Sequence, residues 1–85
     1  MIKEELIVKA GLHARPATAM VKEARSFEAD VILEKDGERA NAKSIIGILS
    51  LEVSPGSTII LEVEGSDEAE CFESIARFIK NGLKQ

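Results

Sequence analysis

The chain has 85 residues, enough for one domain with one small core. Apolar residues make up 45% of the sequence, too many for a disordered segment, and with three Phe and no Trp or Tyr the core must be mainly aliphatic. Fifteen acidic and eleven basic residues give a net charge of -4, which argues against a general nucleic-acid binder, since such proteins present a basic face.

The first two predicted elements are a strand and a helix. The strand covers residues 2–8, where polar–apolar alternation is combined with β-branched residues, and Gly11 interrupts it. Residues 14–27 then place apolar side chains at helical spacing, with Pro16 in the first turn, where its missing N–H costs nothing. The apolar positions are Ala17, Met20, Val21 and Ala24.

A hairpin, a short helix and a further strand follow. Residues 31–34 alternate, and Asp36-Gly37 is a strong two-residue turn signal before a short second arm at residues 38–41. Ser44 is a suitable N-cap for a helix over residues 45–51. After a turn at Ser54-Pro55-Gly56, residues 57–64 form the clearest strand of the chain.

The last predicted element is an amphipathic helix. Ser66 or Asp67 caps it, and acidic residues in its first turn suit the positive end of the helix dipole. Gly82 is the predicted C-terminal stop. One apolar stripe is formed by Phe72, Ile75, Ala76, Ile79 and Leu83.

The predicted order is therefore β-α-β-β-α-β-α, an α+β fold with one sheet and helices packed on one face. The other face must meet solvent, and polar residues are available on the strands to cover it. These residues are Lys3, Glu5, Glu34, Lys35, Glu62 and Glu64.

Cys71 is the only cysteine, so no disulfide can form within the chain, and its neighbours Glu70 and Glu73 would raise the pKa of a thiol. We interpret it as structural.

One His and one Cys cannot close a zinc site, so no metal or cofactor is expected. No apolar run reaches the length of a membrane span and no signal peptide is visible, which favours a cytoplasmic protein without membrane insertion.

His13, the only histidine, stands just before the first predicted helix. Free N–H groups and the helix dipole attract anions there and disfavour positive charge, so a ring nitrogen is available to attack phosphorus. Arg15 adds a guanidinium suited to phosphate oxygens. By position alone, however, most histidines at helix starts are surface residues without a chemical role, and that alternative stays open at this point.

The stretch KSIIGILSL is a second unusual feature. A short helix packed on a sheet buries one stripe, which we expect to be Ile48 and Leu51 with part of Ile45. Ile46 or Leu49 is then exposed, as in a patch for partner docking. The alternative is that all these residues pack under a loop.

The sequences GLHARPA at 11–17, LEKDG at 33–37 and NAKSIIGILSL at 41–51 resemble HPr, the histidine-containing phosphocarrier of the bacterial sugar phosphotransferase system. The resemblance covers the whole chain as a single domain, residues 1–85. It implies an open-faced β-sandwich in which three helices cover one side of a four-stranded antiparallel sheet. One departure is Glu52, which stands where many relatives have glycine, so the second helix is expected to end differently.

The resemblance also implies a function for each matched residue. His13 accepts a phosphoryl group from Enzyme I on its δ1 nitrogen and passes it to Enzyme IIA proteins, with Arg15 beside it. Ser44 matches a regulatory site of an ATP-dependent HPr kinase/phosphorylase. The expected docking residues are Ala14, Thr18, Ile45, Ile46 and Leu49. The protein is then a carrier turned over by its partner enzymes, and we expect a monomer.

Three other interpretations remain. The first is a regulatory binding module that recognises a transcriptional regulator or an enzyme through Ser44 and the apolar helix. The second is a paralogue in a dedicated phosphorelay outside sugar uptake. The third, a small RNA-binding module, ranks last because no predicted strand has an aromatic residue on which bases could stack. A family branch that lacks the histidine acts only in regulation, and His13 places this chain outside that branch.

Overall fold

The computed structural model describes residues 1–9 and 14–81, and for residues 14–16 and 81 it describes the backbone alone. The elements in chain order are β1 (Ile2–Ile7), α1 (Ala14–Arg25), β2 (Asp30–Lys35), β3 (Glu38–Asn41), α2 (Ile45–Ser50), β4 (Thr58–Glu64) and α3 (Glu68–Asn81). The predicted order is confirmed, and each predicted strand is found with its ends shifted by a residue or less. Gly82 and Leu83 lie outside the described residues.

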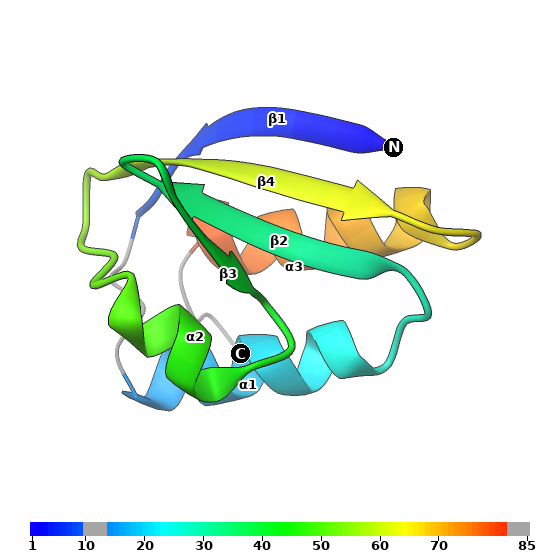
Figure 1. Cartoon of the computed structure of the whole chain (residues 1–85), viewed down its shortest axis with the longest axis horizontal. Helices are drawn as coiled ribbons and strands as arrows, with labels where there is room; N and C mark the ends of the chain where they lie inside the picture. Colours follow the sequence, from blue (N-terminus) through cyan, green and yellow to red (C-terminus); the bar gives the residue numbers. More distant parts are fainter. Residues whose placement is uncertain (10–13, 82–85) are drawn as a thin grey trace.

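The four strands form one antiparallel sheet in the order β1-β4-β2-β3. The three helices lie on one side of it, and the opposite side carries no helix among the described residues (Figure 1). The α+β class and the open-faced arrangement are therefore confirmed. Alternation explains which side is which, because the residues of each strand that face the helices are apolar. Val31 and Leu33 on β2 and Leu61 and Val63 on β4 are fully buried.

Lys35 corrects one prediction about the open face. Leu33 faces the helices, and side chains alternate, so Lys35 lies on the helix side as well. Its Nζ donates to the carbonyls of Leu51 and Glu52, each at 3.2 Å. The ammonium therefore stabilises the C-terminal end of α2 and does not cover the open face. The hairpin itself is as predicted: Asp36 and Gly37 have φ of 52° and 84°, the pattern of a type I′ turn.

The turn between α1 and β2 packs tightly against the turn between β4 and α3. We name this contact the turn junction, residues 27–29 with residues 65–68. At Gly65, whose φ is 157°, an added Cβ would lie 2.6 Å from Ala29 Cα, so only glycine fits without movement. Asp67 Oδ2 accepts from the N–H of Glu28 and Oδ1 from that of Ala29, each at 2.9 Å.

Asp67 therefore does something other than the predicted N-capping. Helix α3 does begin after it, at Glu68, but the carboxylate joins two turns that are distant in sequence. The hydrogen bond from Glu28, and then the one from Ala29, lowers the pKa of Asp67. Glu68 supplies the local contact instead, since its Oε1 accepts from Gly65 N at 3.0 Å and its Oε2 pairs with the N-terminal ammonium at 3.0 Å.

Cys71 is fully buried in α3, in line with a structural role. Burial raises the pKa of the thiol, and the Asp67 carboxylate raises it further. The predicted direction is right, but its cause is the core and Asp67, whereas Glu70 and Glu73 were expected. Within residues 1–9 and 14–81, no helix is both long and apolar enough to cross a membrane.

Candidate functional site

The predicted phosphoryl site surrounds the start of α1. His13 lies outside the described residues, directly before Ala14, the first residue of the helix. Arg15 is the second residue of α1, and its backbone is helical. Thr18 is exposed one turn further along. The predicted positions of Ala14, Arg15 and Thr18 on the first helix are therefore confirmed, whereas the placement of His13 stays a prediction.

The distribution of charge along α1 differs from that along α3. The first turn of α1 contains no acidic residue, and its last turn contains Lys22 and Arg25. In α3 the first turn contains Glu68 and Glu70, which already compensate the positive end of that helix. The start of α1 has no such carboxylate of its own. An anion there would therefore meet free N–H donors and a favourable dipole without repulsion from the helix.

Helix α2 contacts α1, and the two helices run in opposite directions (Figure 1). The last residue of α1, Arg25, donates from Nε to the carbonyl of Lys43 at 2.9 Å, just before α2 begins. Figure 1 shows the end of α2 at the same side of the molecule as the start of α1. The order of features along this side is therefore Ser44, then the exposed residues of α2, then the start of α1.

Ser44 is held in place by its neighbours. Its N–H donates to Asn41 O at 2.9 Å, and Asn41 Oδ1 in turn accepts from Lys43 N at 2.8 Å. Ser44 Oγ accepts from Gly47 N at 3.1 Å, so the predicted N-cap is confirmed. The hydroxyl is half-buried, and no acidic residue stands in the first turn of α2. A negative charge added at Ser44 would meet the positive end of the helix dipole.

The apolar residues of α2 divide as the spacing predicts. Ile48 and Leu51 are buried, and Ile45 is half-buried against the core. Both remaining residues are exposed, Ile46 at 81% and Leu49 at 36%. We name Ile46 and Leu49 the α2 patch. Burial of large apolar side chains is favourable, so a patch that folding leaves outside is available to a partner.

The surroundings of Gly47 and the backbone conformation at the end of α2 were not predicted from the sequence. A Cβ at Gly47 would lie 3.5 Å from the backbone oxygen of Asn41, which is an ordinary contact within the chain. After the C-cap Leu51, Glu52 has φ 53°, the left-handed conformation that glycine favours. The helix therefore ends as it would with glycine at this position, so the prediction that Glu52 changes the helix end is wrong. Glu52 adopts the left-handed conformation although its side chain makes that conformation strained. Local donors satisfy the carbonyls of Gly47, Ile48 and Leu49. Lys35, a contact that no spacing rule signals, satisfies those of Leu51 and Glu52.

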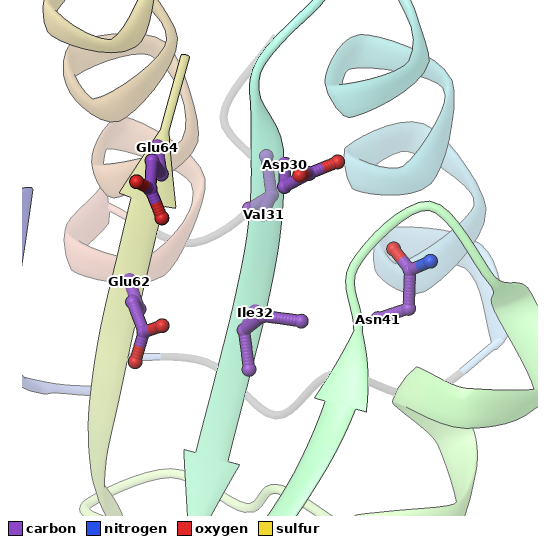
Figure 2. A pocket seen from close by; sticks show the side chains of 6 residues that line it. All are labelled: Asp30, Val31, Ile32, Asn41, Glu62 and Glu64. Atoms are coloured by element: carbon purple, nitrogen blue, oxygen red, sulfur yellow. The ribbon is translucent and has the colours of Figure 1, made fainter. Parts of the chain in front are cut away.

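A hollow of about 310 Å³ lies on the open face of the sheet, away from the predicted site. Figure 2 shows carboxylates of β4 on one side of Ile32 and Asn41 of β3 on the other. Arg39 pairs with Glu62 and Glu34, each at 3.2 Å, and its hydrogen bond lowers the pKa of Glu62. No group of three or more His, Cys, Asp or Glu in the described part of the chain could hold a metal ion. The hollow is a solvated, ion-paired surface.

A family model described as the phosphorylation site of the PTS HPr component matches residues 3–81. HPr-like protein Crh of Bacillus subtilis (strain 168) is 49% identical over 78 residues, which is 92% of each chain. The crystal structure of phosphocarrier protein HPr from Bacillus anthracis str. Ames is similar with a TM-score of 0.90 and 44% identity, covering 93% of this chain and 96% of that one.

A structure of Bacillus subtilis Crh has a TM-score of 0.79 and 46% identity and covers 100% of this chain and 98% of that one. It is described as a swapped, intertwined dimer. The expectation that the present chain is a monomer therefore has no support from this relative.

Proposed function

Since the chain belongs to the HPr family of the phosphotransferase system, we propose that it is a phosphocarrier acting in sugar uptake. His13 accepts a phosphoryl group from phospho-Enzyme I and passes it to Enzyme IIA proteins. The single observation that supports this most strongly is the sequence GLHARPA, of which the residues from Ala14 onward begin α1. In the sequence, the only histidine directly precedes a helix whose first turn has no acidic residue.

In the first step a neutral ring nitrogen of His13 attacks the phosphorus held by phospho-Enzyme I, and a P–N bond to His13 forms as the bond to the donor breaks. In the second step a group of Enzyme IIA attacks that phosphorus, and the P–N bond breaks and leaves His13 neutral again. Free N–H groups at the start of α1 and the guanidinium of Arg15 stabilise the charge of the phosphoryl oxygens during the step. The carrier needs no cofactor, because the energy of the bond comes with the phosphoryl group.

Incubation with Enzyme I and phosphoenolpyruvate tests the proposal. We expect one acid-labile phosphate per chain, lost in His13→Ala with an unchanged melting temperature. Arg15→Lys should fold normally and transfer more slowly, because lysine keeps the charge but loses the two-pronged geometry. A chain that gains no phosphate, or gains it equally in His13→Ala, would show that His13 is not the acceptor.

Regulation at Ser44 is a second function, favoured by the geometry of α2. A phosphate on Oγ would keep an acceptor near Gly47 N and add charge at a helix start, so the fold should persist. The same charge would stand two residues before Ile46, the first residue of the α2 patch, so docking of an acidic or apolar partner surface would become costly. We propose that an HPr kinase/phosphorylase modifies Ser44 and that a transcriptional regulator reads the result.

Two variants separate a switch from a simple cap. Ser44→Asp should melt near the parent protein but accept phosphate from Enzyme I more slowly. Ser44→Ala should lose about 1 kcal/mol of stability but accept phosphate almost normally, since only the cap is removed. If Ser44→Asp is phosphorylated at the parent rate, Ser44 is a helix cap without a regulatory role. We also propose that the chain acts in the cytoplasm, where it would meet Enzyme I and the Enzyme IIA proteins.

A further inference from the structure

The short helix that carries the α2 patch is held at both of its ends by side chains from other elements. Arg25 of α1 donates to the carbonyl of Lys43, just before the helix, at 2.9 Å. At the other end, Lys35 of β2 donates from Nζ to the carbonyls of Leu51 and Glu52, each at 3.2 Å. A helix of six residues is marginal in water by itself, so its position depends on contacts with the rest of the chain.

Lys35 is well placed to fix the end of α2. It is the last residue of β2, paired with Glu38 in the sheet, and its side chain is 22% exposed. The ammonium brings a full positive charge to two carbonyls at the negative end of the helix dipole. It also pairs with the exposed Asp36 at 3.8 Å, and a surface ion pair of that length contributes little. The contact with α2 is therefore the stronger of these two interactions.

The end of α2 that Lys35 holds is also the end nearest the start of α1 (Figure 1). Glu52, one of the two residues that Lys35 contacts there, has φ 53°. A strained backbone of this kind persists only where its surroundings hold it. Glu52 N donates to the carbonyl of Leu49 at 3.1 Å, and the side chain of Leu49 belongs to the α2 patch. A shift at Glu52 is therefore passed directly to the patch.

We propose that Lys35 is a positioning residue for phosphoryl transfer, whose two hydrogen bonds hold the α2 patch in the orientation that Enzyme I contacts. This role rests on the proposed carrier function, and Lys35 acts in it through Leu49. Loss of the ammonium leaves two carbonyls without this donor at a strained turn. The patch then spends part of its time in other orientations.

The expected kinetic effect follows from that loss of order. A partner that binds one orientation has an apparent affinity reduced by the fraction of molecules that adopt it. His13 and Arg15, the residues assigned to the chemical step, are unchanged, so a docked complex reacts at the parent rate. Replacing Lys35 should therefore raise KM for this chain as a substrate of Enzyme I and leave kcat unchanged.

Initial rates of phosphorylation by Enzyme I and phosphoenolpyruvate, measured over a concentration series of the chain, test the proposal. Lys35→Met keeps an unbranched apolar stem and loses the charge and the donors. We expect its KM to rise roughly fivefold, with kcat at the parent value. Lys35→Arg keeps the charge and the N–H donors, so its KM should stay within about twofold of the parent. All variants are assayed below the temperature at which they begin to melt.

Ile75→Val is the matched control for a loss of stability. Ile75 is fully buried in α3, and removing one methylene from the core should lower the melting temperature without changing the end of α2. Its KM should equal that of the parent. An equal rise in KM for Ile75→Val and Lys35→Met overturns the proposal, because a general loss of stability would then explain both.

A variant that lacks the α2 patch tests whether Lys35 acts through it. In a chain that carries both Ile46→Thr and Leu49→Thr, adding Lys35→Met should raise KM less than about twofold further, because the side chains that it positions are already gone. A full additional rise in that background shows that Lys35 acts elsewhere and overturns the proposal. If Lys35→Met does not fold, Lys35→Gln replaces it with the same expectations, since glutamine also removes the charge.

The remaining outcomes separate this role from the carrier function. A parent KM for Lys35→Met overturns the role of Lys35 and leaves the carrier function intact. A lower kcat at the parent KM also overturns it, because Lys35 would then affect the chemical step instead of docking. A parent chain that takes no phosphate refutes the carrier function, and the positioning role is refuted with it.

Discussion

The turn junction and the α2 patch lie on the same protein but are built by opposite means. At the turn junction, backbone touches backbone at Gly65 and Ala29, and the carboxylate of Asp67 satisfies two N–H groups from another turn. At the α2 patch, Ile46 and Leu49 extend from a six-residue helix into solvent. Side chains of the first region contribute to the stability of the fold, whereas those of the second are left exposed, as expected for the proposed docking surface. Substitutions should therefore separate stability from transfer.

The largest expected effect is at Gly65. In Gly65→Ala the new Cβ meets the Ala29 backbone, so one turn must move, and we expect a loss of roughly 2–3 kcal/mol in the free energy of unfolding. Urea denaturation measures it. Gly37→Ala is the matched control, because Gly37 also has positive φ but its Cβ would meet nothing within 4 Å. Equal losses in the two variants would show that backbone strain, and not the close contact, decides at Gly65.

Asp67→Asn should come next, with a melting temperature lower by several degrees at neutral pH. The amide replaces one acceptor oxygen by an NH₂ group that faces an N–H donor. The pKa of Asp67 is lowered in the folded protein, so its contribution is present above the unfolded pKa and is lost as pH falls through the folded pKa. The difference between parent and variant should shrink below about pH 4.

Thermal melts from neutral to acidic pH measure this difference. Asp36→Asn is the control, because Asp36 is an exposed turn residue and asparagine also suits a type I′ turn. Its melting temperature at neutral pH should stay near that of the parent. A difference between parent and Asp67→Asn that persists unchanged in acid would show that the two hydrogen bonds contribute little.

A smaller effect of opposite sign is expected at the end of α2. Glu52→Gly should raise the free energy of unfolding by about 0.5–1 kcal/mol, because glycine adopts the left-handed conformation without strain. Glu52→Ala keeps the strain and should bring no gain. Thermal melts of the two variants measure the contrast. A gain in both would point to the charge of Glu52 as the cause.

The smallest effect on stability is expected at the α2 patch, together with a loss of transfer. Ile46→Thr should change the free energy of unfolding by less than about 0.5 kcal/mol, since the side chain is exposed. Phosphorylation by Enzyme I should slow roughly tenfold if the patch is a centre of docking. Ile7→Thr, at an exposed isoleucine on β1, should transfer at the parent rate. Equal rates for Ile46→Thr and Ile7→Thr would remove the patch from the docking surface.

Local patterns predicted the elements, the two-residue turn at Asp36-Gly37, the Ser44 cap and the division of α2 into buried and exposed residues, because each depends on residues a few positions apart. The exceptions all depend on distant partners. Lys35 was expected on the open face because it is polar, yet it lies on the helix side and its ammonium reaches the end of α2. Asp67 has the sequence of a cap, yet it binds a turn 38 residues away. The role of His13 is inferred from the sequence motif alone, because that residue lies outside the described part of the chain.

The reactivity of the buried Cys71 thiol can be used to measure local unfolding of the protein. The chain has no Trp or Tyr, so unfolding offers little change in intrinsic fluorescence. Cys71 is the only cysteine and is fully buried, and burial raises the pKa of its thiol. A thiol reagent should therefore react only with molecules in which α3 has separated from the core. The rate of modification would then be proportional to the fraction of such molecules. Because Cys71 N also donates to Asp67 O at 3.0 Å, that rate would respond directly to a loosened turn junction.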